Sequence, residues 1–136
     1  MHRELISHIG VAVADLEKSI PVYERLTGSK VGAIAEVTDQ NVRVAMFGGH
    51  GTARIELVAP TSPDSPIARF IQKRGEGLHH ICIYVRNIDQ HLSHLKAAGV
   101  KLIDETPRLG ADGARIAFVH PSSTGGVLLE LEERVT

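Results

Sequence analysis

Two histidines and two glutamates have the residue types and the spacing that suit metal chemistry. His8 and His80 lie 72 residues apart, and Glu56 and Glu130 lie 74 residues apart. Two imidazoles and two carboxylates together suit a borderline divalent ion such as Co²⁺, Ni²⁺, Zn²⁺ or Mn²⁺, whereas Ca²⁺ takes more oxygen ligands. The four residues therefore predict one divalent metal site.

The strands that carry these four residues are expected to turn them all towards one face. Side chains alternate between the two faces of a strand. Each of the four has apolar neighbours of opposite parity, which are expected to pack beneath helices and to leave the polar side chain facing a cleft. These neighbours are Ile9, Val11 and Val13 near His8, Ile81, Ile83 and Val85 near His80, Ile55 and Leu57 beside Glu56, and Leu129 and Leu131 beside Glu130. Any one of the four alone is typical of a structural histidine or a solvated glutamate, so the prediction depends on the set.

An internal repeat accounts for the spacing of the four residues. Each copy begins with a strand and continues with a segment whose apolar residues fall at helical spacing. The matching segments are 8–26 with 80–98, 44–47 with 116–119, and 53–60 with 127–134. The repeat predicts an α+β fold of two tandem βαβββ modules that form a curved mixed sheet around a metal cleft.

The chain is expected to form one domain over residues 1–136. Its parts are module 1 at about residues 5–60, a helical linker at 61–77, and module 2 at about 78–134. Within the linker, Ser65 suits a helix N-cap, Pro66 suits the first helical position, and Gly75 suits the end of the helix.

Composition excludes several classes of protein. The net charge of −1 and the isoelectric point near 6.7 argue against a broad surface for nucleic acid or anionic membranes. No run of 18 apolar residues and no signal-peptide pattern is present, so we expect a protein that neither spans a membrane nor is exported. The single cysteine, Cys82, cannot form an intramolecular disulfide, which fits a reducing compartment. These features predict a cytoplasmic location.

The remaining chemistry-bearing residues are predicted to have ordinary structural roles. His79 has the opposite parity to His80 and should face the helix layer. Cys82 has no adjacent base and is predicted to be a small buried hydrophobe. Other side chains of this kind are expected on solvated helix faces, in turns, at strand ends or as surface charge: His50, His91, His94, Arg108 and His120.

Three stretches of the sequence resemble the methylmalonyl-CoA epimerase family of the vicinal oxygen chelate superfamily. They are HIGVAVADLE from His8, SPDSPIARFIQKRGEGLHHI from Ser62, and RLGADGARIAFVHPSSTGGVLLELEE from Arg108. The resemblance implies the glyoxalase/bleomycin resistance/dioxygenase fold and a homodimer. It also implies a divalent metal, Co²⁺ before Zn²⁺, Ni²⁺ or Mn²⁺.

The resemblance also implies roles for the four residues of the predicted site. His8, His80 and Glu130 would hold the metal, and Glu56 would line the same site as ligand, base or both. The chain departs from the family pattern where some members have glutamine at the position of Glu56 and a glutamate at the position of Val44. Many members also have lysine where this chain has Ser122, which puts a phosphate contact there in doubt.

The activity implied by this resemblance is epimerisation of (2R)- and (2S)-methylmalonyl-CoA. The α-proton between a thioester and a carboxylate would be removed to give an enolate stabilised by the metal. Inversion needs acid–base groups on opposite faces of the substrate, for which Glu56 and Glu130 are the natural pair.

Three other activities are also compatible with these residues. A glyoxalase I-type lactoylglutathione lyase would use similar metal ligands on a glutathione hemithioacetal, and the linker and C-terminal stretches argue against it. An extradiol dioxygenase would use two histidines and one glutamate on Fe²⁺ but is usually longer. A ligand-sequestering protein of the same fold would need no metal, which would leave the four aligned residues unexplained.

Overall fold

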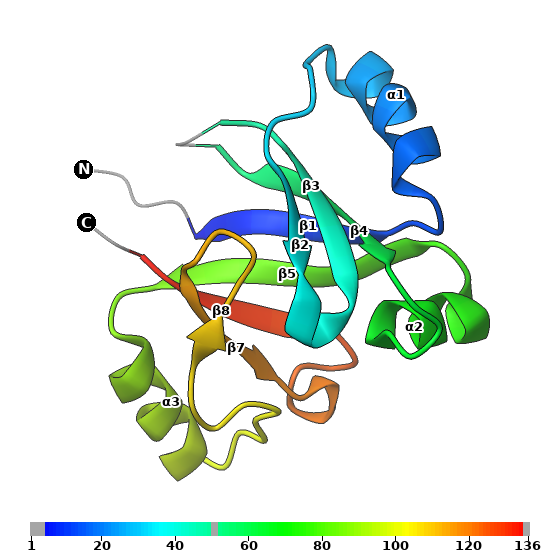
Figure 1. The fold of residues 1–136 in the computed structure, drawn as a ribbon. Helices are drawn as coiled ribbons and strands as arrows, with labels where there is room; N and C mark the ends of the chain where they lie inside the picture. The colour runs from blue at the N-terminus through cyan, green and yellow to red at the C-terminus, as the bar shows by residue number, and fades with distance from the viewer. Residues whose placement is uncertain (1–4, 50–51, 135–136) are drawn as a thin grey trace. The chain divides into compact units, whose positions relative to one another are not determined.

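The computed structural model describes residues 5–49 and 52–134 of the chain. It contains one βαβββ series, a connecting helix and a second βαβββ series (Figure 1). The first series and the helix are β1 (Ile6–Ala12), α1 (Leu16–Thr27), β2 (Ile34–Val37), β3 (Val42–Phe47), β4 (Arg54–Pro60) and α2 (Pro66–Arg74). The second is β5 (Gly77–Val85), α3 (Ile88–Ala97), β6 (Arg108–Leu109), β7 (Arg115–Val119) and β8 (Leu129–Glu133). Two 3₁₀ turns, η1 (Thr38–Gln40) and η2 (Pro121–Ser123), follow β2 and β7. The predicted tandem βαβββ order is confirmed.

The chain forms two compact units. The central unit is Ile9–His79, and the terminal unit combines Met1–His8 with His80–Thr136. The boundary falls inside β1 and inside β5, directly after His8 and directly before His80. Both predicted histidine ligands therefore belong to the terminal unit.

In the central unit, β3 pairs antiparallel with both β2 and β4. Helix α1 packs on β3 and β4, and α2 packs on β4. The core between α1 and the strands consists of Val13, Leu16, Ala45, Phe47, Leu57 and Ala59. Since Val11 and Val13 face this core, the side of β1 that carries branched residues lies beneath a helix as the sequence predicts.

The helix ends in the central unit follow local sequence signals. The Asp15 side chain accepts a hydrogen bond from the backbone N–H of Lys18 at the start of α1. The Ser65 side chain accepts a hydrogen bond from the backbone N–H of Ile67 at the start of α2. The backbone N–H of Gly75 donates to the carbonyl of Ile71 at the end of α2. The predicted start and stop of the linker helix are therefore confirmed.

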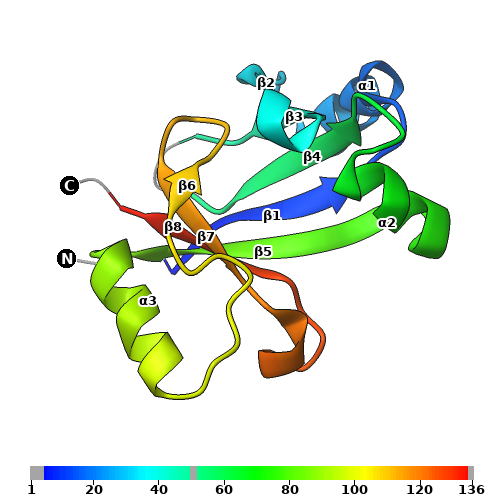
Figure 2. The ribbon, with the colours of Figure 1, turned by 60° about the horizontal axis from the view of Figure 1, so that its bottom comes forward.

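In the terminal unit, β5 pairs parallel with β8, and β8 pairs antiparallel with β7. The sheet is thus mixed, as predicted. Helix α3 packs on β7 and β8 and lies beside these strands in Figure 2. The core beneath it consists of Val85, Ile88, Leu92, Ala117, Val119 and Leu131. Among the described residues, no helix is both long enough and apolar enough to cross a membrane.

Candidate metal centre

Three of the four predicted site residues converge in the terminal unit. His8 Nε2 lies 3.2 Å from His80 Nε2 and 3.2 Å from Glu130 Oε1. His80 Nε2 lies 3.1 Å from the same carboxylate oxygen. The two imidazole rings are perpendicular, with centroids 5.3 Å apart. All three residues are buried, at 4%, 7% and 6% exposure, so this is a shielded cluster of ligand atoms.

Strand alternation and register bring these side chains together. Cys82 on β5 is paired with Glu130 on β8, and partners in a parallel pair share a face. His80 precedes Cys82 by two residues and therefore lies on that same face. The apolar partners on the other face, Ile83 and Leu131, pack towards α3.

The charge on Glu130 favours metal binding. Burial would raise the pKa of the Glu130 carboxyl, but the His8 and His80 imidazoles in contact with it lower that pKa to about 2. The side chain is therefore an anion at neutral pH. A buried anion needs positive charge close by, because removing it from water is otherwise unfavourable.

The spacing of the donor atoms fits a divalent ion. Ligands held about 2.0–2.1 Å from a tetrahedral ion lie roughly 3.3 Å from one another. The three donor atoms of His8, His80 and Glu130 are 3.1–3.2 Å apart. Hydrogen bonds alone cannot satisfy all three contacts, since the two Nε2 atoms cannot both carry a proton and also bond to each other. One cation among the three atoms satisfies them all.

Glu56 lies in the central unit. It is 7% exposed on β4, where it is paired with Met46 of β3. Val44 is a buried apolar residue of β3 and has no carboxylate that could act as a base. The assignment of Glu56 to the metal or to proton transfer stays a prediction.

Two buried polar residues beside His8 were missed by the sequence analysis. Ser7 Oγ lies 3.0 Å from His8 Nδ1 and donates to Glu132 Oε1 at 2.8 Å. Burial raises the pKa of the Glu132 carboxyl, and the Asp112 and Glu130 charges act in the same direction, against the Ser7 hydrogen bond and His8. The signal that could have found Glu132 is its place two residues after Glu130, on the same face of the strand.

Cys82 is wholly buried, as predicted, and its sulfur lies near the cluster. The ligand atoms of His8, Cys82 and Glu130 all lie within 4.8 Å of one another. The thiol donates weakly to Glu132 Oε1 at 3.7 Å. Cys82 therefore adds a soft donor atom to the surroundings of the three-ligand cluster.

A layer of side chains behind His80 includes an arginine. The Phe118 ring meets the His80 ring edge-on at 6.0 Å, and the Arg108 guanidinium lies 5.5 Å from the Phe118 centroid. Arg108 Nε is 3.6 Å from the Asp104 carboxylate, which also accepts from the backbone N–H of Phe118. Arg108 is thus half-buried against an aromatic ring, which corrects its interpretation as surface charge.

The other histidines behave largely as predicted. The His79 ring meets the Phe70 ring of α2 edge-on at 4.8 Å, so it faces the helix layer. His120 Nδ1 accepts from the backbone N–H of Ser122 and caps η2. His94 is exposed on α3. His50 lies outside the described residues.

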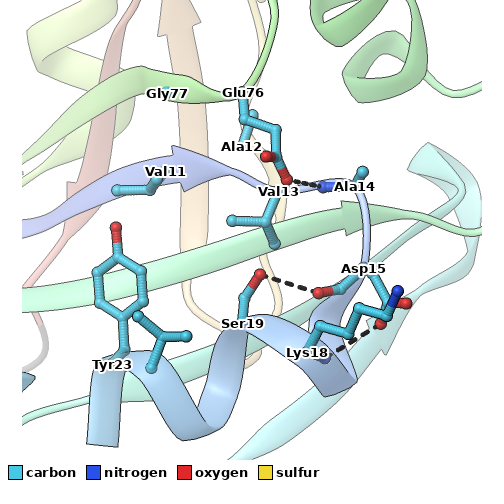
Figure 3. A pocket seen from close by; sticks show the side chains of 11 residues that line it. Val11, Ala12, Val13, Ala14, Asp15, Lys18, Ser19, Tyr23, Glu76 and Gly77 are labelled. Carbon is cyan, nitrogen blue, oxygen red and sulfur yellow. Dashed lines mark hydrogen bonds between the residues drawn. The ribbon is translucent and has the colours of Figure 1, made fainter. Parts of the chain in front are cut away.

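A separate cavity of about 520 Å³ lies in the central unit between α1 and the end of β1 (Figure 3). Glu76 closes one side by accepting from the backbone N–H of Ala14 at 2.7 Å. Asp15 is occupied as the N-cap of α1, and the Tyr23 side chain points towards Val11. The cavity holds no histidine or cysteine and offers no cluster of metal ligands comparable to the buried centre.

Comparison with known proteins defines the class of protein to which this fold and centre belong. A family model described as the Glyoxalase/Bleomycin resistance protein/Dioxygenase superfamily matches residues 7–118. The chain belongs to this superfamily.

Similar proteins of established name narrow this assignment. The mitochondrial methylmalonyl-CoA epimerase of Bos taurus is 40% identical over 129 residues, which cover 94% of this chain and 73% of that protein. The crystal structure of methylmalonyl-CoA epimerase from Mycobacterium tuberculosis has 38% identity and a TM-score of 0.90, covering 97% of this chain and 89% of that one. A variant of the Streptomyces coelicolor methylmalonyl-CoA epimerase in complex with 2-nitronate-propionyl-CoA has 33% identity and a TM-score of 0.89. The match covers 97% of this chain and 95% of that one. Within the superfamily, the chain belongs to the methylmalonyl-CoA epimerase family, and its predicted fold is confirmed.

Proposed function

We propose that this chain interconverts (2R)- and (2S)-methylmalonyl-CoA with the help of a divalent metal ion. The observation that carries the proposal is the convergence of His8, His80 and Glu130 at 3.1–3.2 Å in a buried centre. Family membership supports the reaction, since relatives at about two-fifths identity are named for it and a similar enzyme binds a CoA thioester analogue.

His8, His80 and Glu130 are the proposed metal ligands, and Co²⁺ is the proposed ion before Zn²⁺, Ni²⁺ or Mn²⁺. When bound, such an ion supplies a Lewis acid that offsets negative charge on the thioester oxygen and the substrate carboxylate. The lowered pKa of Glu130 keeps its carboxylate ionised for this role. The buried surroundings strengthen electrostatic interactions at the centre.

Proton transfer is assigned to Glu56 and Glu130. A substrate stereocentre can invert only if one group removes the α-proton and another returns a proton from the opposite side. Both carboxylates are buried, at 7% and 6% exposure. For Glu130, accepting a proton requires loosening its contacts with His8 and His80, because these contacts hold its pKa near 2.

Deuterium exchange tests the proposed reaction. In heavy water, the enzyme is expected to place deuterium at the α-carbon of methylmalonyl-CoA, detected by mass spectrometry. A parallel assay with methylglyoxal and glutathione is expected to show no lactoylglutathione. Product in that assay without exchange into methylmalonyl-CoA would overturn the proposal in favour of a glyoxalase I-type lyase.

A homodimer in the cytoplasm is proposed on the family resemblance and on the sequence features described above. Light scattering after gel filtration is expected to give a mass near twice the 14.7 kDa of one chain. Cell fractionation tests the location.

A further inference from the structure

Behind the candidate metal centre, Glu132, Ser7 and His8 form a continuous chain of hydrogen bonds. Ser7 Oγ donates to Glu132 Oε1 at 2.8 Å and lies 3.0 Å from His8 Nδ1. Ser7 is fully buried, and Glu132 is 7% exposed. The chain ends at the ring nitrogen of His8 that faces away from His80 and Glu130, since those two residues contact Nε2.

The proton positions in these two hydrogen bonds follow from counting the donors and acceptors. A serine hydroxyl has one proton, and Ser7 gives it to the Glu132 carboxylate. The Ser7 oxygen can therefore only accept from His8, so Nδ1 of His8 must carry a proton. In a neutral imidazole, Nε2 then keeps its lone pair, which is the form that binds a metal.

We propose that Ser7 and Glu132 are positioning residues that hold His8 as its Nδ1–H tautomer, with the Nε2 lone pair directed at the point shared with His80 and Glu130. This inference rests on the proposed function, because it gives His8 the role of a metal ligand. Ligating histidines commonly donate their second ring N–H to an oxygen acceptor, and loss of such partners weakens metal binding.

The hydrogen-bonded pair of Ser7 and Glu132 is absent from the equivalent positions of the internal repeat. The repeat equivalents of Ser7 and Glu132 are His79 and Val58. His79 packs its ring on Phe70, and Val58 is a buried apolar residue. These two residues cannot form a hydroxyl–carboxylate pair, so the pair beside His8 has no counterpart at the equivalent positions of the repeat.

A purely structural role explains this pair poorly. Glu132 is buried on the same strand face as the buried carboxylate of Glu130, where two negative charges repel each other. An apolar side chain would fill the position without that penalty, as Val58 does at the equivalent place in the repeat. The unfavourable placement of Glu132 is explained if its carboxylate orients the Ser7 hydroxyl.

The first test is the tautomer of His8 in metal-free protein. Long-range ¹H–¹⁵N correlation at pH 8 is expected to show a protonated Nδ1 for His8 in the wild type. In Ser7→Ala, the Nδ1 signal should move towards the unprotonated position. An unprotonated Nδ1 in the wild type would overturn the proposal.

The second test is Co²⁺ affinity, measured by isothermal titration of the metal alone. Ser7→Ala is expected to weaken binding about 10–100-fold. Glu132→Met should weaken it at least as much, because the freed Ser7 hydroxyl can then donate to Nδ1 and force the proton onto Nε2. The double variant should bind no worse than Glu132→Met, since the two residues act through one chain. Ser7→Thr retains the hydroxyl and should restore affinity to within a few-fold.

Ser65→Ala is the matched control. Ser65 is another fully buried serine, but its hydroxyl caps α2 in the central unit. This variant should melt at a lower temperature while the His8 tautomer and Co²⁺ affinity stay unchanged. Additive losses in the double variant, or Ser7→Ala with an unchanged tautomer and affinity, would overturn the proposal. A wild type that shows the Nδ1 proton but binds no Co²⁺ would support the hydrogen-bond chain and refute the metal site.

Discussion

His8 and His80 face each other through their Nε2 atoms at 3.2 Å, with their rings perpendicular. The two residues occupy equivalent positions in the internal repeat, 72 residues apart. Glu130 Oε1 lies within 3.2 Å of both nitrogens. This buried triangle of donor atoms offers three ligands to one divalent ion.

Replacing Glu130 by glutamine should remove both metal binding and catalysis. Glutamine keeps the size of the side chain but loses the negative charge that a divalent ion needs. Loss of an acid–base group by itself lowers rates by about 10²–10⁴-fold, so epimerisation should fall at least this far. Steady-state kinetics and Co²⁺ titration measure the two effects.

Glu133→Gln is the control for this variant. Glu133 lies on the same strand and is paired with Arg115 at 3.4 Å, away from the three donor atoms. Its replacement should leave Co²⁺ affinity unchanged. An active Glu130→Gln enzyme with normal metal affinity would remove Glu130 from the site.

Glu56→Gln should block α-proton exchange in one stereochemical sense. If Glu56 serves one face of the substrate, its loss should stop deuterium uptake from one epimer and spare the other. Mass spectrometry on separately prepared (2R)- and (2S)-methylmalonyl-CoA resolves the two. Glu36→Gln, at an exposed position on β2, is the control. Full activity of Glu56→Gln would show that the two-glutamate scheme is wrong.

Acid should destabilise the protein partly through Glu130. Its pKa in the folded chain is about 2, below the ordinary value of 4.5, so its contribution to stability is complete above pH 4.5 and is lost as the pH falls towards 2. The contribution amounts to about 3 kcal/mol. Glu132 has the opposite effect on the pH dependence of stability. Its pKa is raised in the folded chain, so its ionisation disfavours folding as the pH rises.

Urea unfolding of metal-free protein at pH 7 and pH 3 measures this effect. The wild type should lose more stability between the two pH values than Glu130→Gln does. Equal losses in the two proteins would contradict the assignment of the low pKa to Glu130.

Chelation should abolish activity reversibly. Protein treated with EDTA and then freed of the chelator should be inactive, and Co²⁺ should restore epimerisation. The circular dichroism spectrum should change little, since both cores lie on the apolar faces of the strands. Undiminished activity without metal would rule out a Lewis-acid role.

The parts of the structure that the sequence predicts are those set by local signals. The N-cap at Ser65 and the stop at Gly75 depend on neighbouring residues, and both are observed. The shared face of His80 and Glu130 follows from strand alternation and the repeat. The helix signals act over a few residues, and the alternation of side chains along a strand is equally local, so the sequence pattern is sufficient for both.

The parts it missed depend on contacts between residues far apart in the chain. The hydrogen bond from Ser7 to Glu132 joins residues 125 positions apart and requires the final register of the strands. The burial of Arg108 depends on the Phe118 ring, which is nearby in the chain but reaches Arg108 only through the pairing of β6 with β7. The alternation of residues along a strand predicts the face of the sheet on which a side chain lies, but not the residue that it contacts.

Anomalous diffraction at the cobalt edge, on crystals grown with Co²⁺, tests the metal centre most directly. We predict one strong peak within about 2.0–2.2 Å of His8 Nε2, His80 Nε2 and Glu130 Oε1. A peak bound by other residues, or no peak among these three atoms at saturating Co²⁺, would contradict the account.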